Sequence, residues 1–166
     1  VSIVNGLGIP IHVLPGFEAD DLMATIAQRA DADDLEVFLV SRDKDLEQLM
    51  TDRVHLYDAA NDEVIDAKAL REKKGYGPEH AVEIQTLAGD STDNIPGVPG
   101  IGIKTAVKLI ELLYLRDHSD EAGHARVMEF LAAAPKWPLT ETLTRRAEQA
   151  LYSNREPADV ILAHFA

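Results

Sequence analysis

The first third of the chain alternates short apolar runs with a segment of helical periodicity, and this alternation restricts the possible folds most. Small and apolar residues recur at helical spacing over residues 19–30. Strand candidates lie on either side, at residues 11–14 and 36–40, and the second has the weak alternation of a parallel strand covered on both faces. A helix over about residues 44–51 and a strand over 54–57 follow. Strand, helix, strand, helix, strand predicts an α/β fold with a partial doubly wound parallel sheet.

From Asp66 onward the pattern is helical. Helices are predicted over about residues 66–73, 78–88, 104–113, 120–133 and 139–151. Asp66 is a suitable N-cap for the first of them, whereas the last fifteen residues show no pattern. We therefore divide the chain into an α/β core over residues 1–65 and a helical region over residues 66–166. The helical region contains a helix–hairpin–helix motif at about residues 86–113.

The distribution of charge limits the classes of partner. The net charge of −13 argues against a generic nucleic-acid binder, whose surface is expected to be basic. The acidity is concentrated, because residues 1–66 hold 15 acidic and 4 basic residues, whereas residues 67–110 hold 5 and 6. Bound divalent cations would cancel part of the excess. No apolar run approaches the roughly 18 residues of a membrane span, so we expect no membrane partner.

Cysteine is absent from the chain. Its absence excludes disulfides and thiolate metal sites, and it fits a reducing cytoplasm. A metal site in this chain would therefore use oxygen or imidazole ligands.

Seven carboxylates in three short clusters are candidate ligands for a metal. They are Glu18, Asp20 and Asp21 in the first cluster, Asp43 and Asp45 in the second, and Asp90 and Asp93 in the third. Hard cations such as Mg²⁺ and Mn²⁺ take oxygen ligands of this kind.

Each cluster also has an ordinary structural interpretation. The first lies at the start of a helix, where the positive end of the dipole tolerates acids, so it could serve only as a cap. The second follows the strand at 36–40, at the end of a doubly wound sheet where ligands bind, but Asp43 could simply cap the next helix. The third opposes the dipole at a helix C-terminus, which a cation would compensate, and a solvated loop is the alternative.

A glycine-rich string follows the third cluster directly, from Gly97 to Thr105. Gly100 and Gly102 permit positive φ and a close approach of the backbone to a phosphate. Lys104 and Thr105 then open a helix whose free N–H groups can bind an anion. An ordinary turn between two helices is the alternative.

Three stretches of the chain resemble a known family. They are Gly16–Asp21, Ser41–Leu46 and Gly89–Ala106. In order and spacing they resemble the 5′–3′ exonuclease domain of bacterial DNA polymerase I, which belongs to the flap endonuclease superfamily with its PIN-like fold. The resemblance covers about residues 5–113, and residues 114–166 resemble the family only loosely.

The resemblance implies a two-metal phosphodiesterase that acts on DNA with 5′ ends or flaps. Glu18 and Asp20 would serve the first Mg²⁺ or Mn²⁺ ion, with Asp20 near both ions. Asp43, Asp45 and Asp93 would serve the second ion, with Asp21 and Asp90 close by. The DNA backbone would be held by the hairpin residues Gly97, Gly100, Ile101, Gly102, Lys104 and Thr105. The hairpin carbonyls would hold a monovalent cation, usually K⁺.

One departure from the family pattern limits this interpretation. The family begins with a strand that carries an essential Asp, followed by a second Asp and a basic helical arch, and none of these precedes Glu18 here. We therefore expect a C-terminal portion of the nuclease that cleaves little on its own. Its partners would be the missing N-terminal segment or a polymerase domain in a parent protein. A non-catalytic, structure-selective DNA-binding module and an unrelated Mg²⁺-dependent phosphohydrolase remain as alternatives.

Overall fold

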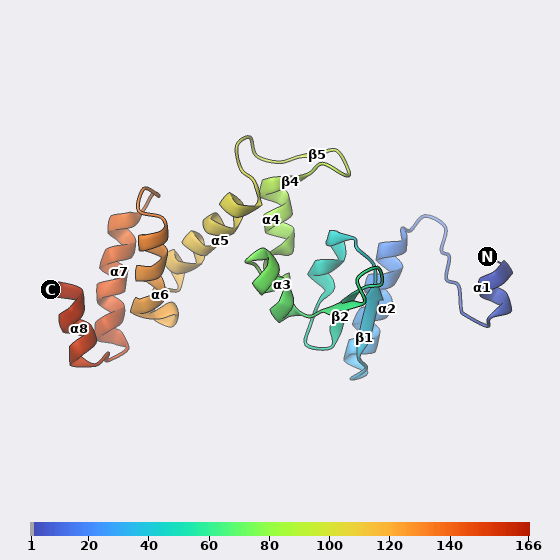
Figure 1. The fold of residues 1–166 in the computed structure, drawn as a ribbon, viewed down its shortest axis with the longest axis horizontal. Helices are drawn as coiled ribbons and strands as arrows, with labels where there is room; N and C mark the ends of the chain where they lie inside the picture. Colours follow the sequence, from blue (N-terminus) through green and yellow to red (C-terminus); the bar gives the residue numbers. More distant parts are fainter. Residues whose placement is uncertain (1) are drawn as a thin grey trace. The chain divides into compact units, whose positions relative to one another are not determined.

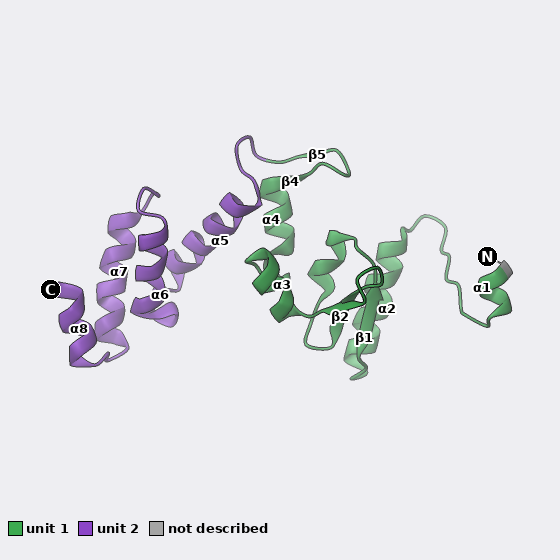
Figure 2. Ribbon diagram, in the orientation of Figure 1, with its two compact units in different colours: residues 1–97 green, residues 98–166 purple. Residues whose placement is uncertain are grey.

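The computed structural model describes residues 2–166 (Figure 1). The chain forms two compact units, residues 1–97 and residues 98–166, shown in different colours in Figure 2. The first unit contains a small sheet with its helices, and the second contains helices only. These units agree with the predicted fold class, an α/β core followed by a helical region. The boundary predicted after residue 65 falls inside the first unit, and as a division into domains it stays a prediction.

A three-stranded sheet in the order β1-β2-β3 forms the centre of the first unit. Strands β1 (Val37–Val40) and β2 (Val54–Asp58) are parallel, with Leu39 opposite Leu56. The predicted parallel pair is therefore confirmed. The short strand β3 (Glu63–Ile65) adds an antiparallel partner to β2, which the sequence pattern did not indicate.

Apolar side chains from the sheet and its helices form the core of this unit. They are Ala27, Leu39, Leu46, Met50, Val54, Leu56 and Leu70. Helix α2 (Ala19–Ala32) contributes Ala27 and packs beside β1 (Figure 1). Helix α3 (Ala67–Lys74) contributes Leu70. As predicted, Asp66 caps α3, because its Oδ1 accepts the Ala69 N–H at 2.7 Å.

Short 3₁₀ turns carry the chain past the sheet. Residues 44–49 form the 3₁₀ helix η1 (Lys44–Leu49), not the predicted α-helix. Asp43 is its N-cap, and the backbone is already extended at Met50. The segment between them has six residues, which is too short for more than a brief helical stretch. A further 3₁₀ turn, η2 (Pro78–His80), leads into helix α4 (Ala81–Ala88).

A loop with closely spaced ends, which we call the neck at Gly89 and Gly97, follows α4. Two-residue strands β4 (Gly89–Asp90) and β5 (Ile95–Pro96) pair antiparallel and enclose the third acidic cluster. Gly89 has a φ of +75°, and a Cβ added there would lie 2.2 Å from the Gly97 nitrogen. A Cβ on Gly97 would lie 2.3 Å from the Ala88 carbonyl carbon. Both positions therefore require glycine.

The second unit is a set of four helices. They are α5 (Ile103–Asp117), α6 (Ser119–Ala133), α7 (Thr140–Ser153) and α8 (Ala158–Phe165). Its core contains Leu115, Val127 and Leu143, all fully buried. Helix α6 is interrupted at Gly123, whose φ is +78°. Helices α5, α6 and α7 confirm three predicted elements, whereas α8 gave no signal in the sequence.

One predicted strand is wrong. Residues 11–14 form no strand in the described part of the chain. Pro10 and Pro15 bracket the segment, and proline gives a sheet no N–H donor. The side chain of Val13 is 81% exposed, so burial does not hold the segment extended either. A short helix α1 (Ser2–Gly6), which was not predicted, precedes it.

No helix within residues 2–166 combines the length and the apolar character needed to cross a membrane.

Candidate metal centre

The second and third acidic clusters meet at one cavity of the first unit. The cavity has a volume of about 290 Å³ and is lined by Asp45, Gln48, Val82, Gln85, Thr86, Asp90, Asp93 and Ile95. Residues more than 40 positions apart in the sequence therefore contribute carboxylates to the same space.

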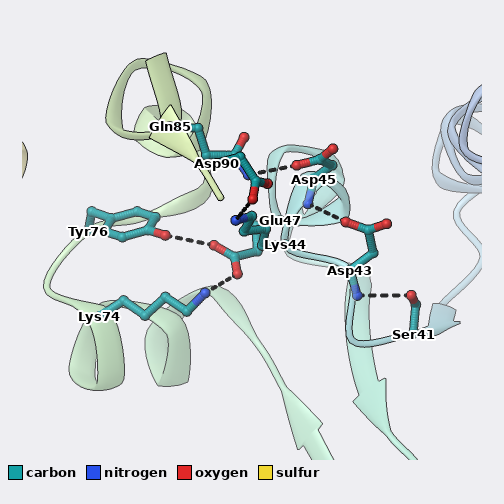
Figure 3. A network of polar contacts seen from close by, with 9 residues as sticks. All are labelled: Ser41, Asp43, Lys44, Asp45, Glu47, Lys74, Tyr76, Gln85 and Asp90. Atoms are coloured by element: carbon teal, nitrogen blue, oxygen red, sulfur yellow. Dashed lines mark hydrogen bonds and ion pairs between the residues drawn. The ribbon is translucent and has the colours of Figure 1, made fainter. Parts of the chain in front are cut away.

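A chain of hydrogen bonds holds the second cluster at the end of β1 (Figure 3). Ser41 Oγ accepts the Asp43 N–H at 3.0 Å, and Asp43 Oδ1 accepts the Asp45 N–H at 3.0 Å. Gln85 on α4 donates from Nε2 to Asp45 Oδ1 at 2.7 Å. One oxygen of Asp43 thus caps η1, as the structural interpretation predicted, while Asp45 is oriented from a separate helix.

Asp90 is the buried carboxylate of the third cluster, with 5% of its surface exposed. Its Oδ1 lies 2.5 Å from the Lys44 Nζ and 2.8 Å from the Thr92 nitrogen, whose N–H it accepts. The hydrogen bond from Lys44 lowers the pKa of Asp90 from 3.8 to about 2, and the backbone N–H of Thr92 adds to this effect. Asp90 is therefore an anion throughout the physiological pH range.

Asp93 has a pKa shifted in the opposite direction. The negative charge of Asp90 raises the pKa of Asp93, and burial and the charges of Asp45 and Asp43 raise it further. Four carboxylates are thus close enough to repel one another.

This donor set fits a hard divalent cation in its chemistry, because it offers only oxygen atoms and a negative charge that a cation would offset. In the arrangement seen here, no three His, Asp or Glu side chains within residues 2–166 form a group that could hold a metal ion.

A buried anchor lies under the second cluster. Glu47 is 4% exposed and accepts a hydrogen bond from the Tyr76 hydroxyl at 3.0 Å, while Lys74 forms an ion pair with its other oxygen (Figure 3). Burial, together with the charge of Glu47, raises the pKa of the Tyr76 hydroxyl. Glu47 thereby fixes η1 to the segment that follows α3.

The first cluster has a more local environment. Glu18 is the N-cap of α2 and forms a capping box with Asp21, whose Oδ2 accepts the Glu18 N–H at 3.0 Å. Asp20 is half-buried, and Glu18 and Asp21 are exposed. None of the three lines the cavity described above. Their role as ligands of a first metal stays a prediction.

The glycine string contains a tight turn and the N-terminus of helix α5. The Val98 carbonyl accepts the Ile101 N–H at 3.0 Å, with Gly100 at a φ of +81°. Gly102 is the N-cap of α5 with extended backbone and a φ of −97°, so of the two predicted positions only Gly100 uses positive φ. Lys104 is exposed in the first turn of α5. The anion site expected here stays a prediction.

Sequence reasoning missed three supporting residues, namely Lys44, Gln85 and Glu47. Lys44 lies inside the motif Ser41–Leu46 and Glu47 directly follows it, but only the aspartates of that motif were interpreted as functional. Gln85 lies in α4, whose sequence contains no motif. A lysine placed between two aspartates was the one available signal.

Family comparisons extend over nearly the whole chain. Residues 1–75 match the 5′–3′ exonuclease N-terminal resolvase-like domain, and residues 76–155 match the 5′–3′ exonuclease C-terminal SAM fold. A resolvase-like α/β domain followed by a helical SAM-fold domain is thus the class of protein that this fold defines. The chain belongs to the 5′–3′ exonuclease family.

Individual relatives agree with this assignment. DNA polymerase I of Rhizobium leguminosarum is 48% identical over 107 residues, which cover 64% of this chain and 10% of that protein. DNA polymerase I of Bacillus caldotenax is 38% identical over 159 residues, covering 93% of this chain and 17% of that protein. The 5′–3′ exonuclease of Buchnera aphidicola from Acyrthosiphon pisum is 38% identical over 109 residues, covering 66% of this chain and 38% of that protein. The chain thus spans well under half the length of these relatives.

A solved structure shares the fold. The T5 5′-exonuclease with bound zinc ions superimposes with a TM-score of 0.61 and 25% identity, covering 89% of this chain and 55% of that one. That neighbour binds divalent metal ions.

Proposed function

We propose that this chain is part of a 5′–3′ exonuclease or flap endonuclease that hydrolyses phosphodiester bonds in DNA with 5′ ends or flaps. Membership of the exonuclease family supports the reaction class. The observation that carries the proposal is the gathering of Asp45, Asp90 and Asp93 around one cavity. Family membership also removes the unrelated phosphohydrolase from consideration.

The proposed cofactor is Mg²⁺ or Mn²⁺ at two sites. A divalent cation at such a site supplies Lewis acidity and lowers the pKa of bound water. The second site would be held by Asp43, Asp45 and Asp93, with Asp90 beside them. The first would be held by Glu18 and Asp20, with Asp21 nearby. Of these two sets, the second has the better support, because Asp45, Asp90 and Asp93 line one cavity and the charges of Asp90, Asp45 and Asp43 raise the pKa of Asp93.

The hairpin is the proposed DNA contact. The backbone of Gly97, Gly100, Ile101 and Gly102, with Lys104 and Thr105, would bind phosphates without reading bases. The hairpin carbonyls would hold a K⁺ ion. The N–H groups of Ile103 and Lys104 open α5 and have no preceding helical carbonyl to bond, which supports an anion site there, whereas the Thr105 N–H already donates to the Gly102 carbonyl at 2.9 Å.

A wider context completes the proposal. We assign the carboxylates of residues 1–65 to a nuclease core and the hairpin to a helical region over residues 66–166, acting in the bacterial cytoplasm. A polymerase domain or a further N-terminal segment of the parent protein would be its partner. The second candidate function is a non-catalytic, structure-selective DNA-binding module. The observation that favours it is that, within residues 2–166, no three His, Asp or Glu side chains are arranged as a group that could hold a metal ion.

A Mn²⁺ titration tests the metal site directly. The variant Asp45→Asn with Asp93→Asn should bind Mn²⁺ at least about tenfold more weakly than the parent, because two oxygen anions are lost. The matched control is Asp52→Asn with Asp159→Asn, which removes the same charge away from the cavity and should bind like the parent. Equal affinities in all three proteins would refute the assignment of the second site.

A further inference from the structure

Lys44 occupies an unusual place among the carboxylates. It stands between Asp43 and Asp45 in the sequence, yet its ammonium group lies 2.5 Å from Asp90 Oδ1 (Figure 3). The contact thus connects η1 to β4. The side chain of Lys44 is 36% exposed, whereas that of Asp90 is 7% exposed. A solvent-accessible cation therefore reaches in to a buried anion.

The charge balance of this group explains the contact. Asp43, Asp45, Asp90 and Asp93 supply four carboxylates, and the Lys44 ammonium forms an ion pair with one of them, Asp90. A buried carboxylate without a counter-charge is costly, so the ion pair stabilises Asp90 when no other cation is bound. An ammonium group is a compact point charge on a flexible four-carbon stem, and it can therefore leave without any change in the backbone.

Asp90 does not depend on Lys44 for its orientation. Its Oδ1 also accepts the Thr92 N–H at 2.8 Å, within the same loop. If Lys44 turned outward, Asp90 Oδ1 would keep this backbone partner and would have acceptor capacity left for a cation in the cavity that Asp45 and Asp93 also line. The geometry therefore lets one cation replace another at the same carboxylate.

We propose that Lys44 is a built-in counter-cation of this carboxylate group, which holds Asp90 in the metal-free protein and is displaced when a divalent cation binds. This inference rests on the proposed function, because it assigns a divalent cation to the second site. Lys44 acts as a competitor that weakens metal binding and protects the fold when metal is scarce. The negative charge of the carboxylates is thus partly offset in both states, by one tethered ammonium or by one divalent ion.

Mn²⁺ binding in charge-matched variants provides the first test. Lys44→Met removes the ammonium but keeps an unbranched apolar stem, and it should bind Mn²⁺ about three- to tenfold more tightly at constant ionic strength. Lys44→Arg keeps the charge and should bind no more tightly than the parent. The control Lys68→Met removes a lysine whose side chain is 83% exposed on α3, and its affinity should match the parent.

Thermal melting supplies a readout that needs no activity. In a chelating buffer Lys44→Met should melt below Lys68→Met, because Asp90 loses its counter-charge. On addition of Mn²⁺ its melting temperature should rise by more than that of the parent. An affinity for Mn²⁺ that is unchanged or weaker in Lys44→Met would overturn the competitor role.

A measurement on the parent protein guards against a variant that does not fold. The ¹⁵N signal of the Lys44 ammonium should shift toward that of a solvated lysine when Mg²⁺ is added, and a signal that stays unchanged while Mg²⁺ binds would overturn the displacement. Failure of the proposed function is distinguishable from this outcome. In that case the parent, Lys44→Met and Lys68→Met would all fail to bind Mg²⁺ or Mn²⁺, and both ideas would fall together.

Discussion

Two acidic clusters of similar composition have different surroundings in this molecule. At the start of α2, Glu18 and Asp21 bond to each other in a capping box, three residues apart. At the cavity, Asp45 and Asp90 take partners from Gln85 and Lys44, at sequence distances of 40 and 46 residues. The first cluster is explained by its own helix, whereas the second and third clusters, which meet at the cavity, need the tertiary fold. Long-range partners, rather than the number of acids, distinguish the better-supported candidate site from a cap.

The largest expected effect tests this distinction through catalysis. In a nuclease that contains this segment, Asp45→Asn should lower the rate of 5′-flap cleavage by about 100-fold or more. Mutation of residues that only support metal ligands already lowers metal affinity or activity by about 10–100-fold. Asp21→Asn should cost less, because the structure gives its side chain a capping role. Rates are measured at saturating Mg²⁺ under single-turnover conditions. Equal losses in both variants would show that the two clusters work as one unit.

Stability should separate the clusters next. Glu47→Ala removes the buried anchor beneath the second cluster and leaves the Tyr76 hydroxyl without its partner. The free energy of unfolding should fall by about 2–4 kcal/mol. Glu72→Ala, which removes an exposed acid on α3, should change it by less than about 0.5 kcal/mol. Denaturant melts monitored by circular dichroism measure both, and a small loss for Glu47→Ala would mean that η1 needs no anchor.

The loss of stability at low pH should depend on Arg42, which lies in the motif Ser41–Leu46. Its guanidinium lies 2.8 Å from Asp58 Oδ1 and lowers the pKa of Asp58 from 3.8 to about 2. A depressed pKa contributes stability above about pH 4 that is lost as the pH falls toward 2. Arg42→Gln should therefore flatten stability between these two pH values, whereas Arg29→Gln on α2 should leave the slope unchanged. Melts at pH 5, 4 and 3 measure it, and parallel curves for the two variants would contradict the Arg42–Asp58 linkage.

The smallest expected effect concerns DNA contact, which neither cluster is proposed to make. Lys104→Ala should weaken binding to every duplex alike and lower the salt dependence of log K by about one unit. Lys136→Ala, an exposed lysine between α6 and α7, is the control. Fluorescence anisotropy at several salt concentrations measures both variants. A loss that varies with base sequence would contradict binding through phosphates alone.

Local signals predicted much of the fold. Asp66 was expected to cap α3 and does so, and helices were expected over about residues 104–113 and 139–151, where α5 and α7 form. These features depend on spacing within one or two turns. The strand at residues 11–14 was predicted from its apolar residues alone, and the flanking prolines and the exposure of Val13 outweighed that preference.

The candidate site was less accessible to sequence reasoning. The motifs indicated Asp45, Asp90 and Asp93, and the structure places all three around one cavity. Lys44 and Gln85 were not found, because their importance depends on partners that lie far away in the sequence. No local periodicity records such a pairing. Helix α8 was missed because it is short and none of its residues is fully buried, and only Val160, Ile161 and His164 are half-buried.

The contact between Gly89 and Gly97 has a consequence for the evolution and engineering of this loop. Neither position can gain a side chain independently, because each added Cβ would overlap backbone at the opposite side of the neck. The two ends of the loop that carries Asp90 and Asp93 therefore lie close together. We therefore expect that residues 89–97 can be exchanged between relatives as one block. A change of length at Gly89 or Gly97 would move Asp90 and Asp93 away from the rest of the site.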